Sequence, residues 1–362
     1  MKRWLTSQFM ALFPLHPPLR KLSGRGGRFG GGRGPTCLLM TLGLLAGSEI
    51  VMRVFFARNM SGRFEYGYNP TAGFVERSDG TVHLVRAGGR RFHPQTFSKT
   101  RPPGTFRVMV IGDSVPRGPS LASSYAIRIA DKLNALGIKA EGFNLAIAGN
   151  GALRSQIVLR QALDYEPSLV ILHVNNSNEF EDEREYKRSQ EFRSWHPRNW
   201  LMKSLLVRRL HEAKTEQVFW KWIPPEVRNV AAASDADAEL KAGQNPEQLR
   251  KWDESVRKYT SESVALARQR GVPILLLTQA TSAPDAAGRF SLNDHGLDEM
   301  AQPLAGNGAA CLSMKEAFIK TDFAPLFSDG SHLRAAGHDL LADAVVKKLL
   351  QDKVVTARNK GG

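Results

Sequence analysis

The feature that most constrains this chain is an apolar segment that stops abruptly in front of a serine. Residues 106–111 read Phe-Arg-Val-Met-Val-Ile and are followed at once by Gly112-Asp113-Ser114-Val115. Such a run predicts a buried strand. A serine just beyond it lies at the carboxyl end of a sheet, where open α/β folds place their ligand sites. The segment therefore predicts an α/β fold with Ser114 at its functional edge.

Strands and helices alternate after this segment. We expect helices at 124–136, 155–165, 246–270 and 335–350, and strands at 141–148, 169–174 and 272–278. Residues 169–174 are continuously apolar, which is typical of a strand covered on both faces, whereas residues 282–322 look irregular. The alternation predicts a three-layer α/β/α sandwich around a central parallel sheet, spanning residues 105–355.

Two segments interrupt or precede this pattern. Residues 181–245 are charged and contain four tryptophans, so we interpret them as a helical insertion that either caps the site or is anchored by those tryptophans on the body. Residues 58–104 hold short alternating stretches separated by glycine and proline, which predict a small β lead-in. Residues 356–362 are expected to be a disordered tail.

The N-terminal region is basic and then apolar. Residues 1–35 are rich in glycine and arginine and predict disorder. Residues 36–57 approach the ~20 residues that span a bilayer, and Glu49 and Arg53 are spaced so that they can pair. We expect an uncleaved transmembrane signal-anchor with the rest of the chain outside the cytoplasm. The alternatives are a signal peptide cleaved near Ala46-Gly47-Ser48 and a buried helix.

The composition further restricts the class of protein to which the chain can belong. The 362 residues are 42% hydrophobic and 23% charged, as in ordinary globular proteins, and carry a net charge of +15. Much of the excess charge lies in the basic tail, where the apolar segment explains it better than nucleic-acid binding does. Two cysteines, Cys37 and Cys311, argue against a disulfide framework and against a cysteine-rich zinc site. We expect no metal, no cofactor and no nucleic-acid partner.

A second motif contains residues that could activate the serine. Asp329-Gly330-Ser331-His332 precedes the last predicted helix. A serine hydroxyl is a weak nucleophile unless a base accepts its proton. His332 is our candidate base and Asp329 the candidate that orients it. Taken singly, Asp329 would be a turn residue and His332 a surface histidine.

Four motifs together carry a family resemblance. They are Gly112–Val115, Asn144–Gly149, Asn176–Phe180 and Asp329–His332. They resemble, in order, the four blocks of the SGNH (GDSL-type) hydrolases over residues 106–350. The resemblance implies Ser114 as nucleophile, with an oxyanion hole from the N–H groups of Ser114 and Gly149 and the side-chain amide of Asn178.

The third block departs from the usual pattern. Asn176 stands where glycine is common, and Glu179 replaces an aspartate. Asn178 is the first choice for the oxyanion amide because Asn178-Glu179-Phe180 matches a variant of the block. Asn176 is the second choice, and both could instead cap the following helix.

Other polar residues near the motifs receive weaker assignments. Asp113 is expected to hold the turn around the serine. Arg117 and Arg154 are candidates for binding an anionic substrate group, although lone arginines are more often surface charges. A structural role is expected for the remaining histidines that we considered, which are His173, His295 and His338.

The resemblance implies a serine esterase acting on acyl or acetyl esters of small molecules, carbohydrates or lipids, and the apolar segment 36–57 adds the expectation that it is membrane-tethered and extracytoplasmic. An O-acetyltransferase acting on cell-surface polysaccharide is the alternative, and an inactive carbohydrate- or lipid-binding domain is a third. Gly149-Asn150-Gly151 fails as a dinucleotide fingerprint because Arg154 occupies the third glycine position. No Gly-x-Ser-x-Gly elbow is present in the sequence.

Overall fold

The computed structural model describes residues 33–55, 74–87, 90–183, 204–207, 238–239, 241–284, 287–306 and 309–355. Almost all of the expected basic tail, the expected C-terminal tail and most of the expected insertion lie outside the described residues.

A five-stranded parallel sheet forms the centre of the main domain. Its order is β10 (Ala309–Ser313), β7 (Ile274–Thr278), β6 (Leu169–Val174), β4 (Phe106–Ile111) and β5 (Ala140–Asn144), and every neighbouring pair is parallel. All six residues of β6 are buried. The α/β fold with a central parallel sheet is therefore confirmed.

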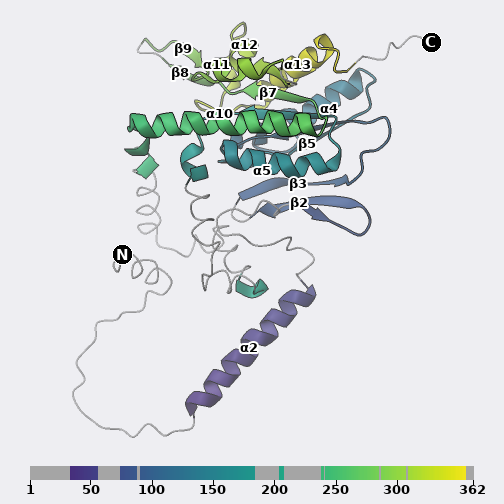
Figure 1. The fold of residues 1–362 in the computed structure, drawn as a ribbon, viewed down its shortest axis with the longest axis vertical. Coiled ribbons are helices and arrows are strands. Elements are labelled where there is room, and N and C mark those ends of the chain that lie inside the picture. Colours follow the sequence, from purple (N-terminus) through teal and green to yellow (C-terminus); the bar gives the residue numbers. More distant parts are fainter. Residues whose placement is uncertain are drawn as a thin grey trace. The chain divides into compact units, whose positions relative to one another are not determined.

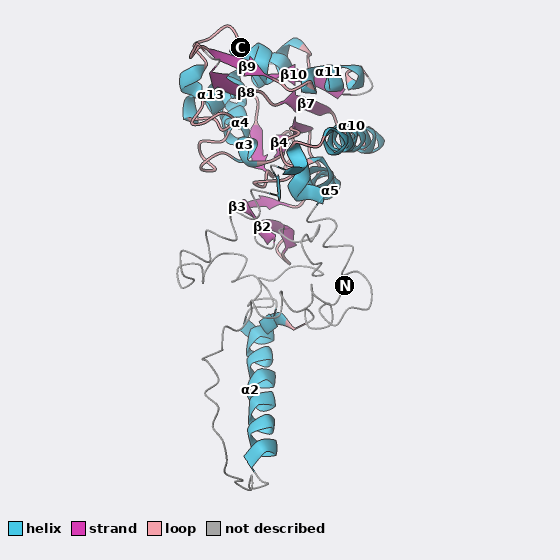
Figure 2. Cartoon of the chain, turned by 90° about the vertical axis from the view of Figure 1, so that its left-hand side faces the viewer, coloured by secondary structure: helices cyan, strands magenta, loops and turns pink. Residues whose placement is uncertain are grey.

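Helices cover both faces of this sheet (Figures 1 and 2). One face carries α4 (Tyr125–Ala135) and α13 (Ala335–Gln351), and the other carries α5 (Ala152–Ala162) and α10 (Pro246–Gln269). Alternate residues of β4 serve the two layers: Val108 and Val110 pack in one core cluster, Met109 and Ile111 in the other. This period of two is what a strand buried on both faces produces.

An antiparallel sheet precedes the domain and shares its core. It consists of β1 (Phe74–Glu76), β2 (Thr81–Ala87) and β3 (Arg90–Ser98) in that order. Its contribution to the core cluster comes from Phe74, Val82, Leu84, Phe92 and Phe97. The fully buried Arg107 joins the two sheets, because its Nε pairs with Glu141 at 2.6 Å while its guanidinium lies 5.6 Å from the ring centre of Phe97.

The segment 282–322 is more regular than the sequence suggested. It contains the hairpin β8 (Thr281–Pro284) and β9 (Phe290–Asn293), the helices α11 (Leu297–Ala301) and α12 (Met314–Phe318), and strand β10. The expectation of irregular structure is wrong here because β10 is an edge strand. All five of its residues are only half-buried, so it lacks the continuous apolar run that reveals a central strand.

Several boundaries also shift, and side-chain contacts explain two of these shifts. The second strand ends at Asn144 and not at residue 148, because the Asn144 side chain accepts the Ala146 N–H (3.0 Å) and turns the chain out of the sheet. The following helix, α5, begins at Ala152, three residues before the expected start.

The apolar N-terminal segment forms a helix of its own, α2 (Arg33–Phe55). Residues Cys37–Phe55 are long and apolar enough to cross a membrane, and none of this stretch is buried inside the protein. The pair expected from the sequence is present, with Arg53 Nε 2.9 Å from Glu49 Oε1.

Candidate active site

Ser114 stands at the first position of a four-residue helix, α3 (Ser114–Arg117), just beyond the end of β4. The Asp113 side chain caps this helix by accepting a hydrogen bond from the Val115 N–H at 3.0 Å. Gly112 permits the tight turn, because a Cβ there would lie 2.7 Å from Pro116 Cγ. The local sequence thus places a half-buried serine at the carboxyl edge of the sheet.

A histidine and an aspartate from the loop before α13 form a chain of hydrogen bonds with this serine. His332 Nε2 lies 2.9 Å from Ser114 Oγ, and His332 Nδ1 lies 2.8 Å from Asp329 Oδ2. Partial burial raises the pKa of Asp329, but hydrogen bonds from the backbone of His332 and Ser331 and from the His332 ring outweigh it and bring the pKa to about 2. The ionised carboxylate favours a proton on Nδ1, which leaves Nε2 as the acceptor facing the serine.

The loop that carries these two residues is tied to the neighbouring hairpin. The Ser282 N–H of β8 donates to Gly330 O at 2.7 Å, and the Ser328 N–H donates to His332 O at 2.8 Å. Asp329 Oδ1 also accepts the N–H groups of Ser331 and His332, each at 2.8 Å. The candidate base is therefore held by its own loop and by β8, and no sequence pattern predicted the contact with β8.

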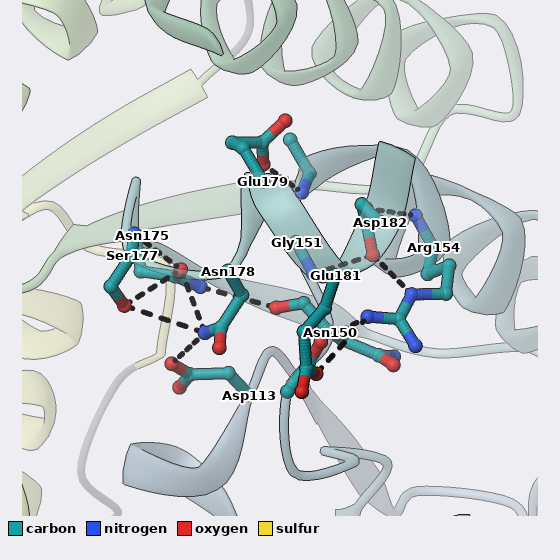
Figure 3. A network of polar contacts seen from close by, with 12 residues as sticks. Asp113, Asn150, Gly151, Arg154, Asn175, Ser177, Asn178, Glu179, Glu181 and Asp182 are labelled. Atoms are coloured by element: carbon teal, nitrogen blue, oxygen red, sulfur yellow. Dashed lines mark hydrogen bonds and ion pairs between the residues drawn. The ribbon is translucent and has the colours of Figure 1, made fainter. Parts of the chain in front are cut away.

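The Asp113 carboxylate is fully buried and faces Asn178 (Figure 3). Asn178 Nδ2 donates to Asp113 Oδ2 at 2.8 Å and to Asn175 Oδ1 at 3.1 Å. Burial raises the pKa of Asp113 to about 6, although the hydrogen bonds from Val115 and Asn178 oppose the rise. The structure thus brings the first-choice oxyanion amide beside the serine turn.

The second-choice amide, Asn176, lies elsewhere. Its Nδ2 reaches the carbonyl of His295 at 3.5 Å, at the end of the β8–β9 hairpin. His295 has a left-handed backbone (φ 52°), and its Nε2 lies 2.7 Å from Thr281 Oγ1.

The loop that contains Gly149, the glycine expected in the oxyanion hole, is tied to the end of β4. Asn150 N–H donates to Ile147 O at 3.1 Å, which closes a turn with Gly149 at its third position in the left-handed region (φ 74°). Ile147 N–H donates to Gly112 O at 3.0 Å and ties the turn to the end of β4. Within the part of the chain that the structure describes, neither the Ser114 N–H nor the Gly149 N–H donates a hydrogen bond to another residue.

Buried carboxylates hold the start of α5 (Figure 3). Asp182 accepts the Gly151 N–H at 2.9 Å and the Arg154 N–H at 3.1 Å, while Glu179 accepts the Ala152 N–H at 2.8 Å. Burial and the neighbouring Asp182 charge raise the pKa of Glu179 to about 7. These acceptors satisfy the first-turn N–H groups, which is why the helix begins earlier than the sequence suggested.

Arg154 is not the surface charge that a lone arginine suggested. It is buried, its Nε pairs with Asp182, and one of its terminal nitrogens donates to Gly149 O. Arg117 is half-buried, and its carbonyl accepts hydrogen bonds from His93 (2.9 Å) and Asn144 (3.1 Å). The buried network around Arg154 was missed in the sequence. The sequence feature that pointed to it was the spacing of Glu179 and Asp182, which are three residues apart and so share one face of a helical turn.

The other expected structural histidines lie behind the serine turn. His173 and His338 are buried, and both flank Tyr125, whose hydroxyl lies 3.1 Å from His173 Nδ1. Burial, together with the charge of His338, lowers the pKa of His173 to about 3, and burial, together with the charge of Arg128, lowers that of His338 to about 4. Both rings are therefore neutral near pH 7.

No protein-family model and no curated protein matches the chain. Solved structures with a similar arrangement include the acetyl xylan esterase AlAXEase, with 14% identity over 67% of this chain and 100% of that chain and a TM-score of 0.41. TesA has 15% identity over 69% of this chain and 99% of its own chain, with a TM-score of 0.41. A catalytic mutant of Axe2, an acetylxylan esterase from Geobacillus stearothermophilus, has 14% identity over 70% of this chain and 97% of its own chain, with a TM-score of 0.41. The chain is thus similar to these structures over 67–70% of its length.

Proposed function

We propose that the protein is a serine esterase that cleaves acyl esters through an acyl-serine intermediate. The observation that carries the proposal is the hydrogen-bonded chain from Ser114 Oγ through His332 to Asp329. In this mechanism Ser114 Oγ attacks the ester carbonyl while His332 Nε2 accepts its proton. His332 then donates that proton to the departing alcohol. A water molecule next attacks the acyl-serine carbonyl while His332 accepts its proton, and His332 returns the proton to Ser114 Oγ as the acid is released.

The developing negative charge on the carbonyl oxygen needs donors aimed at it. We assign the N–H groups of Ser114 and Gly149 to this role because they have no acceptor among the described residues. The Asn178 amide is our candidate for the third donor. Its Nδ2 donates to Asp113 and to Asn175, so the oxyanion would replace one of these two hydrogen bonds. Asp329 remains ionised and stabilises the imidazolium that forms during attack.

A small chromogenic acetyl ester tests the chemistry. We expect turnover by the wild type, and we expect Ser114→Ala and His332→Ala to lose all but a residual activity, a fall of at least about 10³-fold. A fluorophosphonate should label the wild type at Ser114 and leave Ser114→Ala unlabelled. Turnover that survives in Ser114→Ala would contradict the proposal. Addition of sugar acceptors would show whether a hydroxyl can replace water as acyl acceptor.

We further propose that α2 anchors the domain in a membrane with the site on the extracytoplasmic side. The support is the stretch Cys37–Phe55, whose leucines are exposed, together with the basic residues that precede it. Membrane fractionation should place the full-length chain in the membrane, and deletion of residues 1–57 should release it. A chain without these residues that still sediments with membranes would refute the anchor.

A further inference from the structure

We propose that Arg154 and Asp182 form a positioning pair that holds the Gly149 peptide in the orientation required of an oxyanion donor. This inference rests on the ester chemistry proposed above and assigns a task to a buried ion pair that lies outside the Ser114–His332–Asp329 chain.

Gly149 is the residue of this loop that most needs a restraint. Glycine has access to more backbone conformations than any other residue, so a donor N–H on glycine is free to rotate unless its neighbours are fixed. Two hydrogen bonds hold the Gly149–Asn150 peptide, on the carboxyl side of this residue. The Asn150 N–H donates to Ile147 O, and the Arg154 guanidinium donates to Gly149 O. The N–H itself is left without an acceptor among the described residues.

Asp182 in turn fixes the guanidinium (Figure 3). It accepts Arg154 Nε and the Arg154 and Gly151 N–H groups, so one carboxylate holds the side chain and the loop backbone together. The fit is close, since a Cβ on Gly151 would lie 2.6 Å from Glu179 Oε1 and 2.8 Å from Asp182 Oδ2. Both members of the pair are buried, where an ion pair is screened little by solvent.

The backbone of Asp182 is also bonded to Asn178, the first-choice amide of the oxyanion hole. Asp182 N–H donates to Asn178 O at 3.0 Å, so Asp182 belongs to the helical turn that begins at Asn178. A displacement of Asp182 would therefore shift Gly149 through Arg154 and Asn178 through the backbone. The pair keeps the two donors in register with each other.

The geometry requires an arginine at position 154. Nε and a terminal nitrogen point to two different acceptors, the Asp182 carboxylate and the Gly149 carbonyl. The rigid fork of a guanidinium serves both at once, whereas the single ammonium of lysine keeps the charge and loses the fork. Arg154→Lys is therefore the sharpest variant, and Asp182→Asn removes the charge while keeping an acceptor.

The experiment compares these variants with Arg270→Lys in the full-length protein. Arg270 is an exposed arginine paired with Asp164 at 3.0 Å, so it is a matched control away from the site. Active sites are titrated with the fluorophosphonate, and kcat and KM are measured with the acetyl ester. We expect kcat to fall about 10- to 100-fold in Arg154→Lys and Asp182→Asn with KM changed less than about twofold, because a transition-state interaction is lost. The control should match the wild type.

Amide hydrogen exchange gives a readout that does not depend on turnover. The amides of the peptide covering residues 145–153 should exchange at least about tenfold faster in both variants than in the wild type. Their exchange rate should be unchanged in the control. Wild-type kcat per titrated site together with wild-type exchange in Arg154→Lys would overturn the inference, even if the variant melts at a lower temperature. An inert wild-type chain would overturn the proposed function, and the exchange result would then decide separately whether the pair holds the Gly149 peptide.

Discussion

Gln95 pairs with the backbone of Asn144 through both atoms of its amide. Gln95 Nε2 donates to Asn144 O at 2.8 Å, and Gln95 Oε1 accepts the Asn144 N–H at 2.9 Å. The Gln95 side chain, from β3, thus makes the hydrogen bonds that a neighbouring strand would make at the end of β5. Asn144 passes the restraint on, because its own amide donates to the carbonyls of Pro116 and Arg117 in α3. The antiparallel sheet therefore supports the helix that carries the serine.

Gln95→Ala should destabilise the protein by about 2 kcal/mol or more, because it leaves two buried backbone groups without partners. Chemical denaturation measures the change, and Thr96→Ala, at the exposed next position on β3, is the control. We also expect reduced esterase activity per mole of protein. Equal stability of Gln95→Ala and Thr96→Ala would show that the contact to β5 is dispensable.

Asp329→Asn should lower kcat by about 10²- to 10⁴-fold with little change in stability. The amide favours the wrong histidine tautomer, while its oxygen still accepts the loop N–H groups. Steady-state kinetics and a melting curve test the two halves of this prediction. Asp322→Asn, an exposed aspartate earlier in the same region, serves as control. Full activity in Asp329→Asn would exclude Asp329 as the group that orients His332.

Glu179 should make the protein less stable as pH rises. Burial and Asp182 raise the pKa of Glu179 from 4.5 to about 7, while Ala152, Ser255 and Arg154 oppose the rise. The folded state therefore holds a proton that the unfolded state loses between about pH 4.5 and 7, and this stabilisation disappears above pH 7. Relative to the wild type, Glu179→Gln should gain about 3 kcal/mol between pH 4 and pH 8.

Urea denaturation across that range provides the measurement. Glu183→Gln, which replaces a neighbouring glutamate that accepts from Gln248 and Trp252, is the control. A flat difference for Glu179→Gln would mean that Glu179 is ionised in the folded protein at pH 5.

His338 should limit stability in acid. Burial and the Arg128 charge lower its pKa from 6.5 to about 4, so protonation below pH 6.5 favours the unfolded state. His338→Phe keeps an aromatic ring against Tyr125 and removes the titrating group. We expect its melting temperature to fall less than that of the wild type between pH 7 and pH 4.5. A parallel fall in both proteins would assign the acid sensitivity to His173 or to other groups.

The sequence predicted the elements whose burial leaves a strong periodic signal. β4 and β6 are buried on both faces and appear as apolar runs, and Asp329 and His332 share one short loop, so their proximity is local. β10 was missed because an edge strand carries only half of that signal. The predicted boundaries were wrong where a side-chain hydrogen bond ends or begins an element, as the Asn144 side chain ends β5.

The network around Arg154 could not be predicted for a different reason. Arg154 and Asp182 lie 28 residues apart in the chain. The spacing of Glu179 and Asp182 indicates a shared helical face, but it does not identify Arg154 as the partner of that face. An arginine near a glycine-rich turn reads equally well as a surface charge or as a ligand for an anion. Only the packing of the Asp182 turn against α5 distinguishes a third role, in which the charge is neutralised inside the protein.

The hydrogen bond between Ser114 and His332 joins residues 218 positions apart. The ribosome therefore delivers the proposed nucleophile early, with the proposed donors Gly149 and Asn178 soon after it, and the proposed base last. A nascent chain that has been synthesised through β7 holds Ser114 without His332 to accept its proton. In the proposed mechanism, ester cleavage then has to await the synthesis and docking of the loop before α13.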